Sequence, residues 1–264
     1  MTKLAFICAA IALLAACAQN QNPSAEATYA DDAERAYTEA LDEFRADKCL
    51  EAEPKFRKIR RDYPFSRFAA LAELRIADCL LNQDKFAEAV QAYQQFIRFR
   101  PSHGQVPYAN FKVAQAHYEQ IPSDWLLVPP SHERDQGPAR RALEKLRRYM
   151  LDFPNDPRVP EARKMMKDVV KLLAEHELYA ARFYLDRDKP EAAIGRLRTL
   201  LGAYENSGVD AEARLLLGET YLEVRDRAEA RSTLKTLVER HPESDEADDA
   251  RDLLEDLGPQ AGER

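Results

Sequence analysis

The chain is poor in glycine and lacks the short motifs on which most catalytic sites depend. It has 8 glycines in 264 residues, and none belongs to a glycine-rich phosphate loop or a Gly-x-Ser-x-Gly nucleophile turn. Its five histidines are scattered, without an HExxH motif or another spacing suited to paired metal ligands. Cys49 and Cys79 are too far apart for a CxxC redox motif. The sequence therefore predicts no enzyme, no metal site and no cofactor.

β-Branched residues are also few, whereas Ala, Leu, Glu, Arg and Lys are abundant, and this composition favours helices. The formal net charge is −7, and it becomes about −8 if an N-terminal leader containing Lys3 is removed. An acidic chain with mixed charges along its helices is a poor ligand for nucleic acid. The composition indicates an all-α protein that does not bind nucleic acid.

One spaced pattern organises the chain: an alanine, a bulky apolar residue four positions later, and a proline eight positions after that. It occurs as Ala52-Phe56-Pro64, Ala89-Tyr93-Pro101, Ala142-Leu146-Pro154 and Ala230-Leu234-Pro242, with Ala193-Leu197-Glu205 as a fifth copy that lacks the proline. A small and a large residue at i and i+4 share one helix face, so that a second helix can approach closely. This spacing is typical of the second helix of a tetratricopeptide (TPR) repeat.

The copies predict an all-α, right-handed solenoid of about five TPR helix pairs. We expect repeats at residues 33–64, 66–101, 107–154, 159–205 and 210–242, followed by a capping helix to residue 257 and a tail at 258–264. The steps between copies are 37 residues at both ends of the series but 53 and 51 in the middle. The extra residues of the 53-residue step fall at 121–138, where several prolines predict a loop in repeat 3. The extra residues of the 51-residue step predict one long helix that bridges repeats 3 and 4.

The N-terminus has the features of an export signal. Lys3 precedes a short apolar segment at residues 4–14, which is too short to span a bilayer permanently. Leu14-Ala15-Ala16-Cys17 resembles a bacterial lipoprotein box, so we expect a signal peptide at residues 1–16, lipidation of Cys17 and a flexible tether at 17–32. Ala18 after the cysteine implies an outer-membrane location, facing the periplasm. A plain secretory signal with an incidental cysteine is the alternative.

The two remaining mature cysteines are placed symmetrically about a turn. Cys49 lies 15 residues before Pro64 and Cys79 lies 15 after it. Antiparallel helices on either side of that turn would bring the two residues to the same end of the pair. Two interpretations stay open: a disulfide, which an oxidising compartment would favour, or two buried thiols.

The predicted repeat 3 loop carries apolar residues where polar ones are usual. The cluster consists of Trp125, Leu126 and Leu127. Exposed apolar clusters usually mark docking surfaces, so these residues are candidates for a docking patch. The alternative is that the loop folds back and fills the groove of its own repeats.

Four short segments resemble the BamD family, the TPR lipoproteins of the outer-membrane β-barrel assembly (BAM) machine. They are Tyr63-Pro64-Phe65-Ser66, Phe96-Ile97-Arg98 with Pro101-Ser102-His103, Glu133-Arg134-Asp135 and Phe153-Pro154-Asn155. The likeness covers nearly the whole mature chain. It implies a non-enzymatic scaffold that helps to assemble β-barrels and insert them into the outer membrane.

The resemblance also implies partners and residues. The C-terminal repeats would dock the POTRA domains of BamA, with Arg196 at that interface, and other BAM lipoproteins are further candidate partners. A solvated surface arginine is the alternative for Arg196. Because its side chain projects from the face beside the packing residues Ala193 and Leu197, we expect Arg196→Glu to leave stability nearly unchanged while weakening BamA binding. The N-terminal repeats would receive unfolded outer-membrane proteins. Aromatic and arginine residues that suit an aromatic C-terminus are Tyr37, Phe65, Arg67, Phe68, Arg75, Arg98 and Tyr108.

Three other functions compete with this interpretation. A TPR lipoprotein that assists assembly of the type IV pilus secretin would lack the proline-rich repeat 3 loop. A coordinator of periplasmic cell-wall synthesis would have a coiled coil before its repeats, for which residues 18–32 are too short. A wall-cleaving transglycosylase would need a separate catalytic domain, and no residues for one remain.

Overall fold

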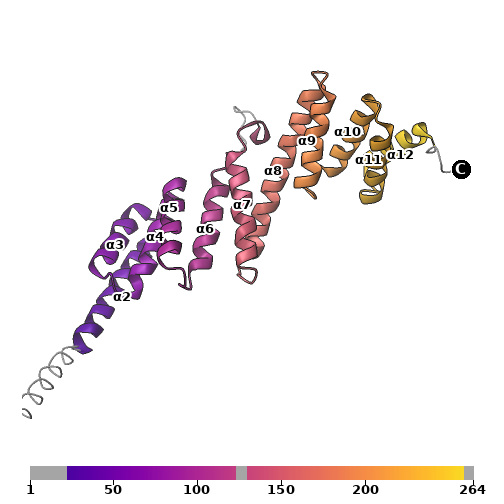
Figure 1. The fold of residues 1–264 in the computed structure, drawn as a ribbon. Coiled ribbons are helices and arrows are strands. Elements are labelled where there is room, and N and C mark those ends of the chain that lie inside the picture. The colour runs from indigo at the N-terminus through magenta and orange to yellow at the C-terminus, as the bar shows by residue number, and fades with distance from the viewer. Residues whose placement is uncertain (1–22, 123–129, 259–264) are drawn as a thin grey trace, which may run out of the picture. The chain divides into compact units, whose positions relative to one another are not determined.

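The computed structural model describes residues 23–122 and 130–258, and this part of the chain contains helices and no strands (Figure 1). The prediction of an all-α fold built from TPR helix pairs is confirmed. The signal peptide, Cys17, the docking-patch residues Trp125, Leu126 and Leu127, and the tail at 259–264 lie outside the described residues. Within the described ranges, no helix combines the length and apolar character needed to cross a membrane.

The alanines and bulky residues of the repeat pattern lie in the core between the helices. All five alanines and all five bulky partners have 0% of their surface exposed. Complete burial of a large apolar side chain contributes about 1.5–3 kcal/mol, so each repeat gains a similar increment. The helices also end as the pattern predicts: each stops two residues before its proline, as at Asp62 before Pro64 and Arg240 before Pro242.

The chain divides into two compact units, at residues 1–103 and 104–264. The described part of the first unit contains four helices: α2 (Pro23–Arg45), α3 (Cys49–Asp62), α4 (Arg67–Asn82) and α5 (Phe86–Phe99). Neighbouring helices in the chain pack against each other, α2 on α3, α3 on α4 and α4 on α5. A buried Asp78 on α4 accepts hydrogen bonds from Tyr93 Oη and Arg75 Nη1, each at 2.5 Å, and so joins α4 to α5.

The second unit contains the remaining described helices. They are α6 (Val106–Glu119), the 3-10 helix η1 (Ser131–Glu133), α7 (Gly137–Asp152), α8 (Val159–Leu185), α9 (Pro190–Ala203), α10 (Asp210–Glu223), α11 (Arg227–Arg240) and α12 (Asp245–Leu257). The 27-residue helix α8 contributes to two apolar clusters. Its N-terminal half, with Val169 and Leu173, packs with α6 and α7, and its C-terminal half, with Leu178 and Ala181, packs with α9 and α10.

Helix α2 begins earlier than the composition predicts. It starts at Pro23, inside the segment 17–32 that we expected to be a tether. Proline has a fixed φ that suits the first turn of a helix, where its missing N–H is not needed. The alanines and glutamate that follow it have high helix propensity, and this outweighs the absence of an apolar period.

Candidate functional site

Arg196 is held by a buried acid on the neighbouring helix. Its Nη1 lies 3.2 Å from Glu177 Oε2, and the Glu177 side chain is only 3% exposed while that of Arg196 is 41% exposed. The Arg196 guanidinium also lies 5.9 Å from the centre of the Tyr184 ring. Hydrogen bonds to Glu177 and then to Tyr184 raise the pKa of Arg196 above its ordinary value. This geometry favours a revised expectation, that a charge reversal at Arg196 destabilises the fold, because the side chain pairs with a buried carboxylate.

A second arginine reaches the same carboxylate. Arg140, on α7, lies with Nη2 3.8 Å from Glu177 Oε1 and is 57% exposed. The sequence analysis did not select Glu177 or Arg140. Glu177 was detectable in principle, since it follows Leu173 by four residues and precedes Ala181 by four, so that it falls on the apolar stripe of α8.

The seven residues expected to bind unfolded substrate differ in burial and in the unit to which they belong. Tyr37 and Phe68 are 7% and 8% exposed and pack on each other with their ring centres 5.3 Å apart, so they are core residues. Arg75 forms an ion pair with the buried carboxylate of Asp78. Tyr108 belongs to the second unit, where Arg158 lies 5.2 Å from its ring centre. Their burial leaves Tyr37 and Phe68 little surface for a ligand, because aromatic residues in a helical repeat are as useful inside the core as on a surface.

The three other candidates remain accessible in the first unit. Phe65 is 94% exposed in the turn between α3 and α4. Arg67 follows at the start of α4 and makes an exposed ion pair with Glu34 at 3.5 Å. Arg98, also exposed, lies with its guanidinium 5.2 Å from the centre of the Phe99 ring. These residues, unlike Tyr37 and Phe68, are free to meet a partner.

A small cavity in the first unit has the composition expected for an aromatic ligand with a carboxylate. Its volume is about 170 Å³, and it is lined by Arg60, Glu73, Ile76, Ala92, Gln95, Phe96 and Phe99. Phe99 is 70% exposed, so an aromatic face is available at the mouth. Arg100 Nη2 donates to Glu73 Oε1 at 2.9 Å and neutralises the one acid of the lining. Phe99 is not among the residues predicted from the sequence, although it follows Phe96 by three residues and so lies on the same side of α5.

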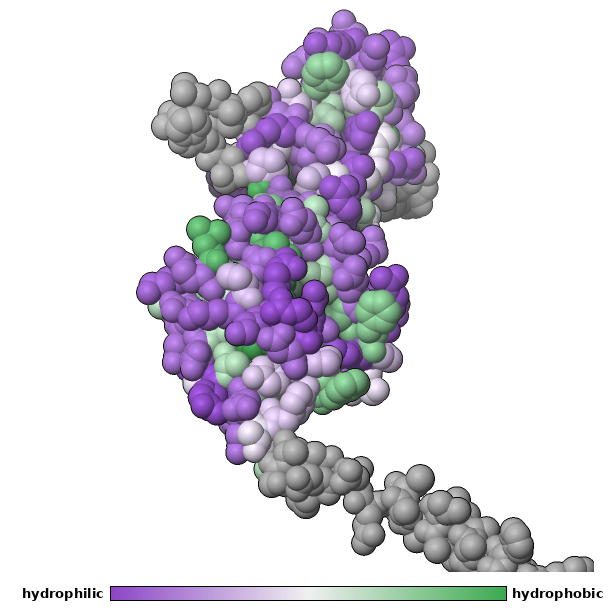
Figure 2. Space-filling view, turned by 90° about the vertical axis from the view of Figure 1, so that its left-hand side faces the viewer, coloured by the Kyte–Doolittle hydropathy of each residue, from purple (hydrophilic) through white to green (hydrophobic). Residues whose placement is uncertain are grey.

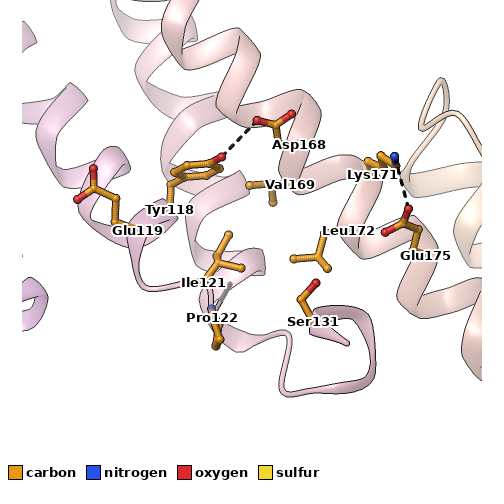
Figure 3. Close-up of a pocket in the computed structure, with 10 residues that line it drawn as sticks. All are labelled: Tyr118, Glu119, Ile121, Pro122, Ser131, Asp168, Val169, Lys171, Leu172 and Glu175. Atoms are coloured by element: carbon orange, nitrogen blue, oxygen red, sulfur yellow. Dashed lines mark hydrogen bonds and ion pairs between the residues drawn. The ribbon is translucent and has the colours of Figure 1, made fainter. Parts of the chain in front are cut away.

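A larger pocket, of about 410 Å³, lies in the second unit between the end of α6, η1 and α8 (Figure 3). Ile121, Pro122, Val169 and Leu172 supply its apolar wall, and Tyr118 closes one side. Its polar lining residues pair with one another: Tyr118 Oη donates to Asp168 Oδ2 at 3.2 Å, and Lys171 Nζ lies 3.7 Å from Glu175 Oε1. Burial, followed by the charge of Asp168, raises the pKa of Tyr118.

Large apolar side chains are otherwise dispersed over the described surface. The face in Figure 2 is mainly hydrophilic, with separate hydrophobic groups. The exposed large apolar residues are Leu50, Phe65, Phe99, Leu151, Tyr179 and Phe183. Docking at such a surface depends on charge and a few apolar contacts more than on one broad apolar patch.

Cys49 and Cys79 meet as the symmetry about Pro64 predicts, but as free thiols. Both are buried, at 6% and 0% exposure, and no disulfide joins them. Burial, and then the neighbouring Cys49 thiol, raise the pKa of Cys79. Asn82 Nδ2 lies 3.8 Å from Cys49 Sγ across the two helices. Of the two interpretations left open, the structure contains the buried thiol pair.

The described residues contain no group of three or more histidine, cysteine or acidic side chains arranged to hold a metal ion. Two of the histidines make a structural contact with each other. His176 Nδ1 lies 2.6 Å from the carbonyl oxygen of His132, and this contact fastens η1 to α8. The described surfaces offer paired arginines, exposed aromatic rings and the cavities lined by Phe99 and by Tyr118.

Comparison with known proteins places these features in a family. Residues 29–225 match the YfiO family, described as an outer membrane lipoprotein, and residues 212–244 match a tetratricopeptide repeat. The outer membrane protein assembly factor BamD of Neisseria gonorrhoeae is 26% identical over 241 residues, covering 88% of each chain. BamD of Caulobacter vibrioides is 28% identical over 222 residues, covering 84% of this chain and 70% of that protein.

Solved structures share helical repeats at low similarity. The TPR2AB domain of yeast Sti1 in complex with an Hsp90 peptide is 10% identical, with a TM-score of 0.44, and covers 85% of this chain and 83% of that chain. Pseudomonas aeruginosa PilF is 16% identical, with a TM-score of 0.34, over 88% of this chain and 95% of that chain. Neither similarity is high enough to distinguish one repeat protein from another.

Proposed function

The chain belongs to the YfiO family of outer membrane lipoproteins, and on this premise we propose that it docks BamA and receives unfolded outer-membrane proteins as a scaffold. It is a BamD-type outer membrane protein assembly factor and not an enzyme. The observation that carries the proposal is the family match over residues 29–225, together with BamD relatives aligned over most of the chain. Two surfaces described above give the proposal a physical form.

For BamA, the proposed contact is the region around Arg196 on α9. Its side chain is 41% exposed and is oriented by Glu177 and Tyr184, and a guanidinium has five N–H donors, so some donors remain for a partner. An arginine whose position is already set loses less side-chain entropy on binding than a freely rotating one. A carboxylate on a POTRA domain would complete the interaction.

For unfolded outer-membrane proteins, the proposed receptor is the cavity lined by Ile76, Phe96 and Phe99. These side chains would contact the aromatic residue at the end of a substrate chain. Arg60 in the lining and Arg98 beside Phe99 would attract the terminal carboxylate. Phe65 and Arg67, both exposed, extend the same kind of chemistry to the turn between α3 and α4.

For localisation, association with the outer membrane follows from the family. We propose that a lipid on Cys17 makes that attachment and that the helical units face the periplasm. Each acyl methylene buried in the bilayer contributes about 0.8 kcal/mol, so several chains anchor a protein stably. The segment between Cys17 and Pro23 would span at most about 22 Å when fully extended, which keeps the first unit near the membrane.

A tagged pull-down from solubilised outer membrane tests the proposed function directly. We expect BamA to be the main co-purifying protein, in roughly equal amount to the tagged chain. Recovery of a pilus secretin, or of cell-wall synthases, in place of BamA would contradict the proposal and favour one of the alternative TPR lipoprotein functions. A second purification with an unrelated tagged lipoprotein controls for capture through the membrane.

A further inference from the structure

Glu177 is an acidic side chain at a junction of three helices in the second unit. Both α7 and α9 pack on α8, which carries Glu177 on its buried side. Leu173 is the last buried α8 residue of one apolar cluster, and the other cluster takes Ala174, Leu178 and Ala181 from α8, so Glu177 lies among apolar core residues. A carboxylate at such a place is costly to bury unless cations compensate it.

Two cations do so, from two different repeats. Arg140 comes from α7 and approaches Oε1, whereas Arg196 comes from α9 and approaches Oε2. The three groups together carry one excess positive charge. The excess is at the surface, because Arg140 and Arg196 are 57% and 41% exposed while Glu177 is 3% exposed.

We propose that Arg140 and Arg196 together bind one carboxylate on the surface of the BamA POTRA domains, and that Glu177 is the positioning residue that holds the two guanidiniums beside each other. The inference rests on the proposed docking of BamA and names a second contact residue, Arg140, for it. Each guanidinium has five N–H donors, so contact with Glu177 leaves donors for a second acceptor.

The chemistry of this arginine pair favours a carboxylate on a protein over a polyanion. Planar guanidiniums bind carboxylates through paired, directional hydrogen bonds. A chain with a net charge of −7 repels extended polyanions, whereas a single acidic side chain experiences mainly the nearest charges. Glu177 holds both arginines before binding, so little side-chain entropy is lost when the partner arrives.

Neutral substitutions test the pair without burying a new charge. The variants are Arg140→Gln and Arg196→Gln, and Arg147→Gln is the matched control. Arg147 is exposed on the same face of α7, about 10 Å further along the helix. The measurements are the Kd for the purified periplasmic POTRA fragment of BamA and, on the same samples, the urea midpoint of the full chain.

We expect Arg140→Gln and Arg196→Gln each to raise the Kd about tenfold, and Arg147→Gln to change it less than twofold. If both arginines bind one carboxylate, the double variant should weaken binding by clearly less than the product of the two single effects. Loss of affinity in variants whose urea midpoints still show a folded chain separates a binding role from a structural one.

Several results would overturn the inference. An Arg140→Gln variant that binds as tightly as wild type, while Arg196→Gln binds tenfold more weakly, would limit Arg140 to neutralising Glu177. Equal weakening by Arg147→Gln would mean that only the general charge of α7 matters. In both cases the docking of BamA would stand. A wild-type chain that does not bind the POTRA fragment would overturn the proposed docking as well as this inference.

Discussion

At the scale of single residues, Arg196 pairs with Glu177 inside the protein, in addition to the contact with BamA that we propose for it. Arg196→Glu would place a second carboxylate against Glu177, which is 3% exposed. Removing one partner of a buried ion pair costs about 3–5 kcal/mol. Because Arg196 is partly exposed and Arg140 also reaches Glu177, we expect a loss of about 2 kcal/mol in the free energy of unfolding.

Urea unfolding of the full chain measures this loss, with Arg196→Lys as the control that keeps the positive charge. The lysine variant should stay within about 1 kcal/mol of wild type, since a charge next to Glu177 is retained. If Arg196→Glu unfolds at the wild-type urea concentration, the contact with Glu177 contributes nothing to stability. Weaker binding of the Arg196→Glu variant must be compared with its loss of stability before it is attributed to a lost interface contact.

The buried thiols Cys49 and Cys79 should be oxidised when the chain is made in the periplasm. They are adjacent, and a disulfide-bonded oxidase can accept the two electrons while two protons leave the thiols. We expect protein purified from the periplasm to show no free thiol after denaturation without reductant. A bridge that closes a loop of about 30 residues would add about 3 kcal/mol to stability.

Chain produced in the cytoplasm without its signal peptide is the reduced control. It should show two titratable thiols after denaturation, and a lower melting temperature than the periplasmic protein. Two thiols in both preparations would mean that the pair remains reduced and buried, as in the structure.

At the scale of elements, glycines report how closely helices approach. A Cβ on Gly218 of α10 would lie 2.6 Å from Cδ2 of Leu234 on α11, a side chain with no exposed surface. Gly218→Ala should therefore destabilise the chain by about 1–3 kcal/mol, although alanine favours helix. Gly195 of α9 has nothing within 4 Å of the same position, so Gly195→Ala should stabilise by about 0.5–1 kcal/mol.

Thermal unfolding of Gly218→Ala and Gly195→Ala, compared with wild type, measures both changes in stability. Opposite shifts in melting temperature are the expected result. Equal shifts in both variants would mean that Leu234 moves aside at little cost and that helix propensity alone determines the change in stability.

The turn between α7 and α8 depends on an acid with a lowered pKa. Hydrogen bonds from Arg158, and then from Tyr149, lower the pKa of Asp156 to about 2 from an ordinary value of 3.8. A carboxyl group whose folded pKa is lowered stabilises the fold above its unfolded pKa and loses that contribution as the pH falls toward 2. The contribution at neutral pH is about 2 kcal/mol.

Asp156→Asn should therefore lower the free energy of unfolding by up to that amount at pH 7. The difference from wild type should shrink between pH 4 and pH 2, because the unfolded wild-type chain binds a proton at Asp156 below about pH 4, whereas the folded chain does so only near pH 2. Urea titrations at pH 7, 5, 4 and 3 give the comparison. A difference that stays constant through this range would mean that the charge of Asp156 does not contribute.

At the scale of the whole molecule, the attachment to the membrane that we propose depends on one residue ahead of the described helices. Cys17 is the cysteine that follows small residues at the end of the apolar segment. Cys17→Ser should abolish lipidation, and cell fractionation should find an uncleaved precursor or a chain released from the outer membrane. Acylation that persists in this variant would rule out the lipoprotein assignment of that cysteine.

The helical repeats could be predicted from the sequence because their signal is local. The spacing of Ala230, Leu234 and Pro242 describes one helix face and its end, and both follow from geometry within about a dozen residues. Local spacing also predicted that Cys49 and Cys79 lie close together, since residues equally far from a turn lie side by side on the two antiparallel helices. Family membership followed from short segments of this kind.

Only the tertiary structure decided what the individual polar and aromatic side chains do. Arg196 meets Glu177 from 19 residues away, and Arg140 meets it from 37 residues on the other side. Tyr37 and Phe68 became core while Phe65 became surface, although all three are aromatic residues of the first two repeats. Such outcomes depend on the packing angle between helices and on the rotamers that remaining space permits, and neither is encoded in local spacing.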